Sequence, residues 1–481
     1  MTQLVHLVFQ IRTLGTFFHL NMENFPRNTG ISGQLNTLTC VFVGIVRNIV
    51  PNGCTRQEQC SNAMLWRKNR FHSGVKMVVL FLFCNYTAPK RKGPNMPIIN
   101  RLAELLPEIT AWRRDIHAHP EVLYDTHRTS ALVADKLRAF GCDQVETGIG
   151  RTGVVGVIRG KQTTSDRVIG LRADMDALPI QEMTGLDYAS THDGKMHACG
   201  HDGHTAMLLG AAKYLCETRQ FNGTAVVIFQ PAEEGGAGAR EMCDDGLMDR
   251  FNIQEVYGMH NWPGMPAGQF AIRPGPFFAA SDFFDIHVAG KGGHAAKPHE
   301  AVDPVVVASQ IITALQTISS RNTDPVHQVV VSVTSVESSS HAYNVIPSAV
   351  HLKGTVRTLD AGVRDLAEQR LVDIATATGT AFGATVDAKF QRSYPVMVNH
   401  ADHTDYASQV AREIAGDCDD APLIMGGEDF AFMLEQRPGA YILVGNGDSA
   451  PVHNPYYNFN DDIIPAGSSW FVQMVQTRMP V

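Results

Sequence analysis

Three histidines, a cysteine and an aspartate crowd into the first nine residues of segment 196–212, which reads MHACGHDGHTAMLLGAA. Cys199 and His201 are two residues apart, and a thiolate with an imidazole suits zinc, manganese or cobalt. Both can reach one ion only where the backbone curls between them. The same residues also allow a nucleophilic Cys199 with His197 or His201 as its base, or a loop histidine before a helix. The segment alone leaves these three interpretations open.

Two adjacent glutamates, Glu233 and Glu234, stand in the sequence QPAEEGGAGA. Burying both without partners would be unfavourable. Neighbouring side chains point in different directions, so one carboxylate can bind a cation while the other handles protons. That division of labour suits metal-assisted hydrolysis. A solvated surface turn is the other interpretation of the pair.

Two further histidines stand in polar sequence: His260 in VYGMHNWPG and His453 in APVHNPYYNFND. Each one alone is more typical of a structural or surface histidine. Five ligands of suitable type are too many for one tetrahedral site, but they suit two ions that share a bridge. The five candidate metal ligands are Cys199, His201, Glu234, His260 and His453.

Strand and helix patterns alternate through the segment that holds these residues. This alternation predicts an α/β fold with a central, mostly parallel sheet and helices on both of its faces. Ligands in such sheets bind beyond the carboxyl ends of the strands. The polar groups of RADMD, QPAEEGG and GMHNWPG follow the expected strands VIGL, AVVIF and EVY. The expected helices cover 99–119, 126–141 and 202–215, and the expected strands cover 152–160, 167–176 and 224–234.

Asp174 and Asp176, in RADMDALP, lie on the same side of an extended strand. Either carboxylate can hold a ligand histidine by a hydrogen bond, or modulate a bridging group. A turn aspartate ahead of Pro179 is the alternative interpretation.

The pattern changes near residue 280. The segment 280–392 has the order β-α-β-β-α-β, with helices expected over 304–320 and 364–378. The earlier pattern resumes near residue 393, with a helix through 404–416 and a strand over 440–445. We therefore expect one domain, built from 96–279 and 393–481, that carries an inserted domain over 280–392.

Residues 1–95 differ from the rest of the chain in net charge and in lacking a regular amphipathic pattern. They hold eleven Lys or Arg and two Asp or Glu, so the remaining residues carry a net charge of −17 within a total of −8. A globular part this acidic is a poor candidate for nucleic-acid binding. Amphipathic order begins at Met96, which predicts that Met96 is the natural start and that 1–95 is a misassigned or disordered extension. An unfamiliar N-terminal module is the alternative.

The apolar runs within 1–95 are too short to span a bilayer, and no basic-then-apolar signal peptide is present. The nine cysteines are odd in number and widely spaced, which argues against a disulfide framework. We therefore expect a cytoplasmic protein without a membrane partner.

Six motifs occur in this order: DMDALP, HACGHDGH, PAEEGGAGA, GMHNWPG, GKGGHAAKPH and MGGEDFAF. Together they resemble the hippurate hydrolase, or N-acyl-amino-acid amidohydrolase, branch of the aminoacylase-like dinuclear metallopeptidases. The resemblance runs from residue 98 to the C-terminus and leaves the first 95 residues uncovered. It implies a catalytic α/β domain with an inserted lid that also forms dimers.

The resemblance also implies roles for the metal-binding residues. Cys199 would bridge two divalent ions, either manganese, zinc, cobalt or nickel. Glu234 and His453 would complete the site of one ion, and His201 and His260 the site of the other.

Catalytic and substrate-binding roles follow from the same resemblance. Glu233 would be the general base and acid, and Asp176, rather than Asp174, would orient or tune a ligand. In the lid, His294 would reach the substrate carbonyl, often from the partner subunit. Asn344 and Arg357 would grip a carboxylate or carbonyl oxygen, for which a guanidinium is well suited. Structural or supporting roles are expected for His117, His119, His197 and His204.

The sequence thus predicts a metal-dependent amidohydrolase that cleaves N-acyl or aroyl amino acids, such as hippurate, to a carboxylate and a free amino acid. Its partners would be this small molecule and a second copy of the chain. A dipeptidase or carboxypeptidase, a hydrolase dependent on Cys199, and a non-enzymatic binding protein on the same fold are the alternatives. The preferred acyl group stays open.

Overall fold

The computed structural model describes residues 98–481 and four short strands before them. In that earlier part, β1 runs parallel to β4, while β2 and β3 pair antiparallel with β4. These strands are β1 (Thr39–Gly44), β2 (Ala63–Leu65), β3 (Asn69–Arg70) and β4 (Lys76–Phe83). They belong to a unit separate from Lys92–Val481. The prediction that 1–95 is an extension falls mostly outside the described residues and stays a prediction.

An eight-stranded sheet forms the centre of the larger part of Lys92–Val481, here called the large lobe (98–279 and 395–481). Its four middle strands, β20, β9, β7 and β8, are parallel to one another, as predicted. Strands β6 and β5 continue the sheet antiparallel at one side. In spatial order the strands are β19 (Asp419–Asp420), β10 (Phe270–Ile272), β20 (Gly439–Gly447), β9 (Glu255–Pro263), β7 (Val168–Asp174), β8 (Thr224–Gln230), β6 (Gly153–Arg159) and β5 (Gln144–Ile149).

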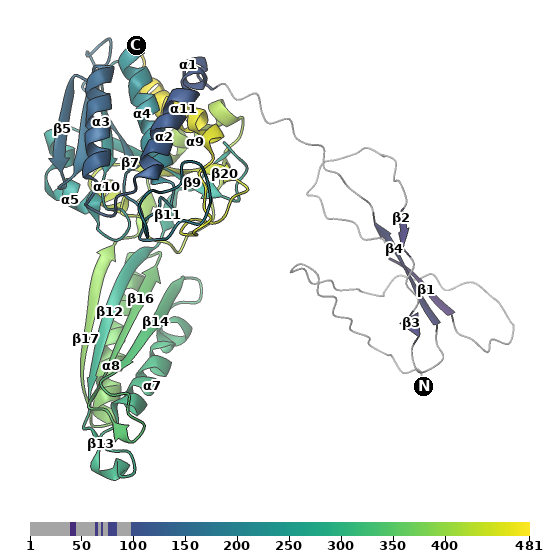
Figure 1. Cartoon of the computed structure of the whole chain (residues 1–481), viewed down its shortest axis with the longest axis vertical. Coiled ribbons are helices and arrows are strands. Elements are labelled where there is room, and N and C mark those ends of the chain that lie inside the picture. The colour runs from purple at the N-terminus through teal and green to yellow at the C-terminus, as the bar shows by residue number, and fades with distance from the viewer. Residues whose placement is uncertain (1–38, 45–62, 66–68, 71–75, 84–97) are drawn as a thin grey trace. The chain divides into compact units, whose positions relative to one another are not determined.

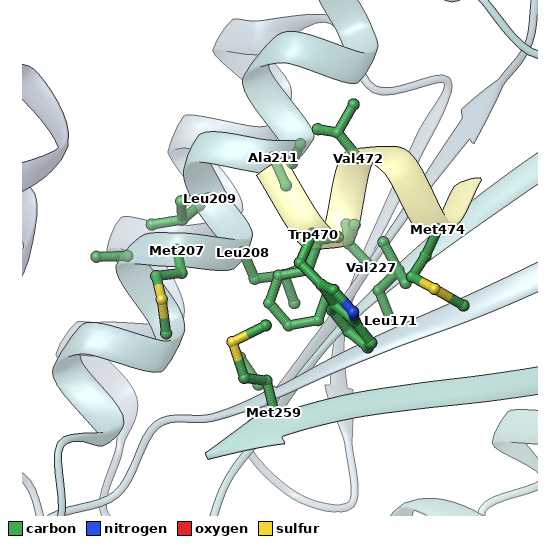
Figure 2. Close-up of a cluster of buried hydrophobic side chains, with 14 of the residues drawn as sticks. Leu171, Met207, Leu208, Leu209, Ala211, Val227, Met259, Trp470, Val472 and Met474 are labelled. Atoms are coloured by element: carbon green, nitrogen blue, oxygen red, sulfur yellow. The ribbon is translucent and has the colours of Figure 1, made fainter. Parts of the chain in front are cut away.

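Helices cover both faces of this sheet (Figure 1). The larger apolar core joins one face to α1 (Asn100–Glu104), α2 (Leu106–Ala118), α3 (His127–Phe140), α4 (His201–Thr218), α9 (Ala401–Ala415) and α11 (Ile464–Arg478). The second core joins the other face to α5 (Gly238–Asp244), α6 (Leu247–Arg250) and α10 (Ala431–Gln436). Figure 2 shows the centre of the first core, where Trp470 of α11 packs with Leu208 of α4 and Leu171 of β7. Burial of the strands on both faces explains their continuous apolar runs.

Two predicted helices differ in extent from the observed ones. The helix expected over 99–119 is interrupted at Leu105, because Pro107 begins a second helix and has no N–H to continue the first. The helix expected over 304–320 ends at Leu315 and is followed by a short π-helix, Ile318–Asn322.

The remaining residues form a small lobe (280–394) with its own sheet and apolar core. The sheet is antiparallel, with strand order β14, β16, β12, β17, and α7 and α8 pack against one of its faces. The elements follow the predicted order: β12 (Ala280–Ala289), α7 (Pro304–Leu315), β14 (Val329–Ser338), β16 (Ala349–Thr358), α8 (Ala361–Ala381) and β17 (Thr385–Tyr394). A short antiparallel pair, β13 (Gly293–His294) with β15 (Val345–Ile346), lies beyond the far end of β12.

The two connections between the lobes run side by side. Strand β11 (Gly275–Phe278) leads into β12, and β18 (Met397–Asn399) follows β17; the two pair antiparallel. The functional division into a catalytic domain and a lid stays a prediction. No helix in the described part of the chain is both long and apolar enough to cross a bilayer.

Candidate active site

The loop before α4 curls so that Cys199 and His201 face the same space. Gly200 lies between them with φ of 94°, in the left-handed region. A Cβ there would come within 2.3 Å of the Asn261 side chain and 2.5 Å of the Tyr457 hydroxyl. Only glycine therefore fits this position, and it supplies the curl that a shared metal site requires.

His260, which lies in β9, approaches Cys199. The sequence pattern predicted that His260 follows a strand, but β9 continues through it to Pro263, because β20 keeps pairing alongside. Its Nδ1 lies 2.6 Å from the Asn261 carbonyl oxygen, to which it donates, and its Nε2 lies 3.3 Å from the Cys199 Sγ. A histidine fixed at one nitrogen by a carbonyl commonly presents the other nitrogen to a metal.

Glu234 and His453 meet on the other side of Cys199. The His453 Nε2 lies 3.2 Å from the Glu234 Oε1. The backbone amide of His453 donates to the Ala198 carbonyl at 2.7 Å, which ties this loop to the one that carries Cys199. His453 has a φ of 63°, and its side chain is half-exposed.

The candidate ligands fall into two groups that share Cys199. In one group, ligand atoms of Cys199, His201 and His260 lie within 4.8 Å of one another; in the other, those of Cys199, Glu234 and His453 do. The five residues are here called the ligand cluster. They divide as the resemblance implies for two ions, and their role as metal ligands remains a prediction.

Unpartnered polar atoms provide an independent test of the fit. Both ring nitrogens of His201 and the Glu234 Oε1 are buried and make no hydrogen bond within the described part of the chain. Buried polar atoms are nearly always paired, so this cluster requires a partner from outside the chain. Thiolate, imidazole and carboxylate ligands together suit a borderline divalent ion.

Asp176 connects His201 to the glutamate loop. One carboxylate oxygen lies 3.4 Å from the His201 Nδ1. The same carboxylate accepts the backbone amides of Glu233 at 3.0 Å and Glu234 at 3.1 Å. Asp176 therefore orients both a candidate ligand and the loop of the candidate base.

Glu233 is buried at the edge of the ligand cluster. Its Oε2 lies 4.0 Å from the His201 Nε2. Burial, together with the nearby Glu428 carboxylate, raises the pKa of Glu233 well above its usual range. A carboxylate with a raised pKa is suited to take up a proton and to give it back near neutral pH.

A set of buried charged residues that supports the site was missed by sequence reasoning, apart from Asp174. Arg172 is fully buried and donates to Asp174 at 2.7 Å, to Glu428 at 3.1 Å and to Asp429 at 3.0 Å. Asp429 also accepts the backbone amide of Ala239, so it supports the loop that follows Glu233. The motif MGGEDFAF marked this segment, but its carboxylates could not be told from surface acids.

His204 is likewise part of this framework rather than a free histidine. Its Nδ1 lies 2.6 Å from the Asp174 Oδ1, and its Nε2 accepts the backbone amide of Asn261 at 2.9 Å. It thereby holds the strand that carries His260, in keeping with the supporting role expected for it.

The predicted substrate-binding residues lie in two different places. Arg357 is near the junction of the lobes, next to Gly427 of the large lobe. A Cβ placed on Gly427 would lie 3.4 Å from the Arg357 Nη1. His294 and Asn344 line an open cavity of about 540 Å³ around β13 and β15. Since β12 alone spans about 30 Å from Ala280, this cavity is remote from the ligand cluster within one chain. Figure 1 shows β13 at the far end of the small lobe.

Comparison with known proteins identifies the family of this chain. The pattern of the peptidase family M20/M25/M40 matches residues 170–477, which include every member of the ligand cluster. The chain belongs to this family. The fold that the resemblance implied is therefore confirmed at the level of the central α/β sheet.

Three relatives illustrate the range within the family. The chain is 42% identical to a hippurate hydrolase of Campylobacter jejuni, over 79% of this chain and 98% of the relative. It is 38% identical to thermostable carboxypeptidase 1 of Saccharolobus solfataricus, over 78% of this chain and 97% of the relative. The crystal structure of a dinuclear metal-binding M20 peptidase from Bacillus subtilis is 32% identical and has a TM-score of 0.69, with coverage of 78% and 99%.

The protein is thus a metal-dependent amidohydrolase, as predicted, and the non-enzymatic alternative is set aside. Cys199 belongs to both groups of three candidate ligand atoms, which favours a metal ligand over a nucleophile. Burial and the carboxylates of Glu234 and Glu233 raise the pKa of its thiol well above the usual range. A divalent ion held by the ligand cluster would offset this shift, because a metal-bound thiol is deprotonated.

Proposed function

We propose that this enzyme hydrolyses N-acyl or aroyl amino acids, such as hippurate, to a carboxylate and a free amino acid. The observation that carries the proposal is the pair of three-ligand groups that share Cys199, with the Glu233 carboxylate beside them. The similarity to a hippurate hydrolase supports this substrate class.

The ligand cluster would hold two divalent ions, either manganese, zinc, cobalt or nickel. Such ions polarise an amide carbonyl and increase the acidity of water. Glu233 takes the proton of the attacking water and returns it to the leaving nitrogen, so that the amine departs uncharged. Asp176 keeps the His201 ring and the backbone of Glu233 in place during both transfers.

Substrate recognition is assigned to the small lobe. Arg357 is half-buried at the junction of the lobes, where its guanidinium can bind the carboxylate of the amino-acid part. His294 and Asn344 are remote from the ligand cluster of their own chain. We therefore propose a homodimer in which these two residues reach the site of the partner subunit.

The proposed base is tested by Glu233→Gln. We expect turnover of hippurate to fall by about 1,000-fold or more, because the amide cannot accept a proton. Elemental analysis should still find two ions per chain, since Glu233 is outside both groups that share Cys199. The matched control is Glu241→Gln on α5, which removes a surface carboxylate that pairs with Arg151. A near-normal rate for Glu233→Gln would show that another group is the base.

The substrate class is tested separately by comparing hippurate, N-acetyl amino acids and unblocked dipeptides. A preference for unblocked dipeptides would favour a dipeptidase, and release of C-terminal residues from longer peptides would favour a carboxypeptidase. The similarity to a thermostable carboxypeptidase makes the latter the second candidate function. We expect the blocked amino acids to be cleaved fastest.

A further inference from the structure

The loop that carries Glu233 is held from both sides. On one side, Asp176 accepts the amides of Glu233 and Glu234. On the other side stands the hydroxyl of Tyr394, the last residue of β17. A loop clamped in this way keeps its position only while both supports stay in place.

The Tyr394 hydroxyl uses its full hydrogen-bonding capacity on this loop. It donates to the Glu233 carbonyl oxygen and accepts the amides of Gly235 at 2.8 Å and Ala237 at 3.2 Å. A hydroxyl has one proton to donate and two lone pairs, so all three are engaged. The side chain is 6% exposed, so water does not readily replace these bonds.

The loop needs such support because its backbone is bent into an unusual conformation. Ala232 and Ala237 both have φ of 56°, in the left-handed region, and Gly235 has φ of 96°. Alanine is disfavoured there, and the conformation persists only where the surroundings fix it. Tyr394 bonds Glu233, Gly235 and Ala237 within this bent stretch, and Asp429 bonds Ala239 just after it.

Tyr394 also belongs to the small lobe. It pairs with Ser281, the second residue of β12, so the ends of β12 and β17 that adjoin the two connections lie side by side here. Gly427 is packed into this junction: a Cβ on it would lie 2.8 Å from the Ser281 Cβ, 3.3 Å from the Tyr394 ring and 3.4 Å from the Arg357 Nη1. Any shift of the small lobe therefore moves the tyrosine that holds the glutamate loop.

We propose that Tyr394 is a positioning residue that transmits the placement of the small lobe to the carboxylate of Glu233. When the lobe is seated as in this structure, the hydroxyl fixes the carbonyl of Glu233, and the carboxylate points to the ligand cluster. When the lobe moves, the loop relaxes and the carboxylate leaves its position. This inference rests on the proposed role of Glu233 as the base.

The first test is Tyr394→Phe, with Tyr257→Phe as the matched control. Tyr257 is a buried tyrosine whose hydroxyl donates to Glu255 at 2.9 Å, away from the glutamate loop. We expect kcat of Tyr394→Phe to fall by about tenfold or more, because small errors in the placement of a base are costly. KM should change less than twofold, and the content of two ions should be kept. The control should keep kcat and show a similar shift in melting temperature.

The second test compares Gly427→Ala with Gly426→Ala. A Cβ on Gly426 meets only the Ile424 side chain at an ordinary 3.5 Å, whereas one on Gly427 pushes on the junction. We expect Gly427→Ala to lower kcat several-fold in the wild-type background and to have little further effect in the Tyr394→Phe background. Gly426→Ala should leave kcat unchanged in both.

Two results would overturn the inference: a kcat of Tyr394→Phe within twofold of the wild type, or independent effects of Tyr394→Phe and Gly427→Ala. Glu233→Gln distinguishes this failure from failure of the proposed function. If Glu233→Gln keeps its turnover, the assigned base is wrong whatever Tyr394 does. If Glu233→Gln is inactive and Tyr394→Phe matches its control, only the positioning role is wrong.

Discussion

Two buried charged clusters lie at the carboxyl ends of the central strands, and their polar atoms are paired in opposite ways. The arginine cluster consists of Arg172 with Asp174, Gln230, Glu428, Asp429 and Tyr441. Every guanidinium nitrogen there has a partner. The ligand cluster leaves both nitrogens of His201 and one oxygen of Glu234 without a hydrogen bond among the described residues, although Asp176 and His453 lie 3.4 Å and 3.2 Å from two of these atoms.

The contrast separates framework from site. Fully paired charges in the arginine cluster fix β7, β8 and the segment that contains Asp429 relative to one another. Unpaired atoms in the ligand cluster are available to a bound ion. His197 shows that lack of a partner is not sufficient, because both of its nitrogens are also unpaired, yet it joins no group of three ligand atoms. A metal site needs both features.

The largest expected effect is on the ligand cluster. His260→Ala removes one ligand of the group that contains His201, and we expect loss of one ion and about a 1,000-fold fall in kcat, since an ion supplies several kcal/mol of charge stabilisation. Elemental analysis and steady-state rates check both. His287→Ala, an exposed histidine of the small lobe, is the control. Unchanged ion content in His260→Ala would exclude it as a ligand.

Substitutions in the arginine cluster should lower the stability of the fold. Arg172→Met leaves the carboxylates of Asp174, Glu428 and Asp429 buried without their cation, which should lower the free energy of unfolding by roughly 3–5 kcal/mol. Urea unfolding of the metal-free proteins measures this. In Arg167→Met, which removes a partly exposed partner of Glu255, the loss should stay below about 1 kcal/mol. Equal losses in the two variants would contradict the framework role.

The same contrast exists between two buried histidines, His117, which has a partner, and His197, which has none among the described residues. It predicts how the stability of the protein depends on pH. Burial opposes the charge of His117, but the adjacent Asp202 carboxylate outweighs it and raises the pKa to about 9. Burial lowers the pKa of His197 to about 3. Because the folded pKa of His117 exceeds the unfolded value of 6.5, its stabilisation is complete below pH 6.5 and is lost as the pH rises through 9.

The unfolding free energy should therefore fall by roughly 2–3 kcal/mol between pH 6.5 and 9. Urea unfolding across this range measures the slope. In His117→Asn the slope should flatten, because the titrating group is gone. A slope that persists in this variant would assign the pH dependence to other groups.

The ligand types could be predicted from the sequence, because cysteine, histidine and paired glutamates mark such sites by chemistry. The apolar run before Glu233 and Glu234 also placed them after a strand, β8, whereas His260 lies within β9. The arginine cluster could not be found in this way. Arg172 lies in an ordinary strand, and its partner Asp429 is 257 residues later, in the motif MGGEDFAF, which does not show that the carboxylate is buried.

Tyr394 was missed for a similar reason. Its hydroxyl acts on a loop 161 residues earlier, and a tyrosine at the end of a strand carries no local signal of that contact. The distance of His294 from the ligand cluster of its own chain is also a feature of the three-dimensional structure. It arises because the length of β12 lies between them.

Asp176 belongs to neither cluster and connects the ligand cluster to the glutamate loop, so it gives the finest test of the contrast. Asp176→Asn replaces one acceptor oxygen with a donor, which cannot accept the amides of both Glu233 and Glu234. We expect about a tenfold fall in kcat with both ions retained, the size typical for a residue that orients a ligand. Asp143→Asn, which loses a comparable bond to a backbone amide at Arg159 far from the site, should leave kcat unchanged. If Asp176→Asn instead loses an ion, Asp176 acts on the metal through His201 rather than on the base through its loop.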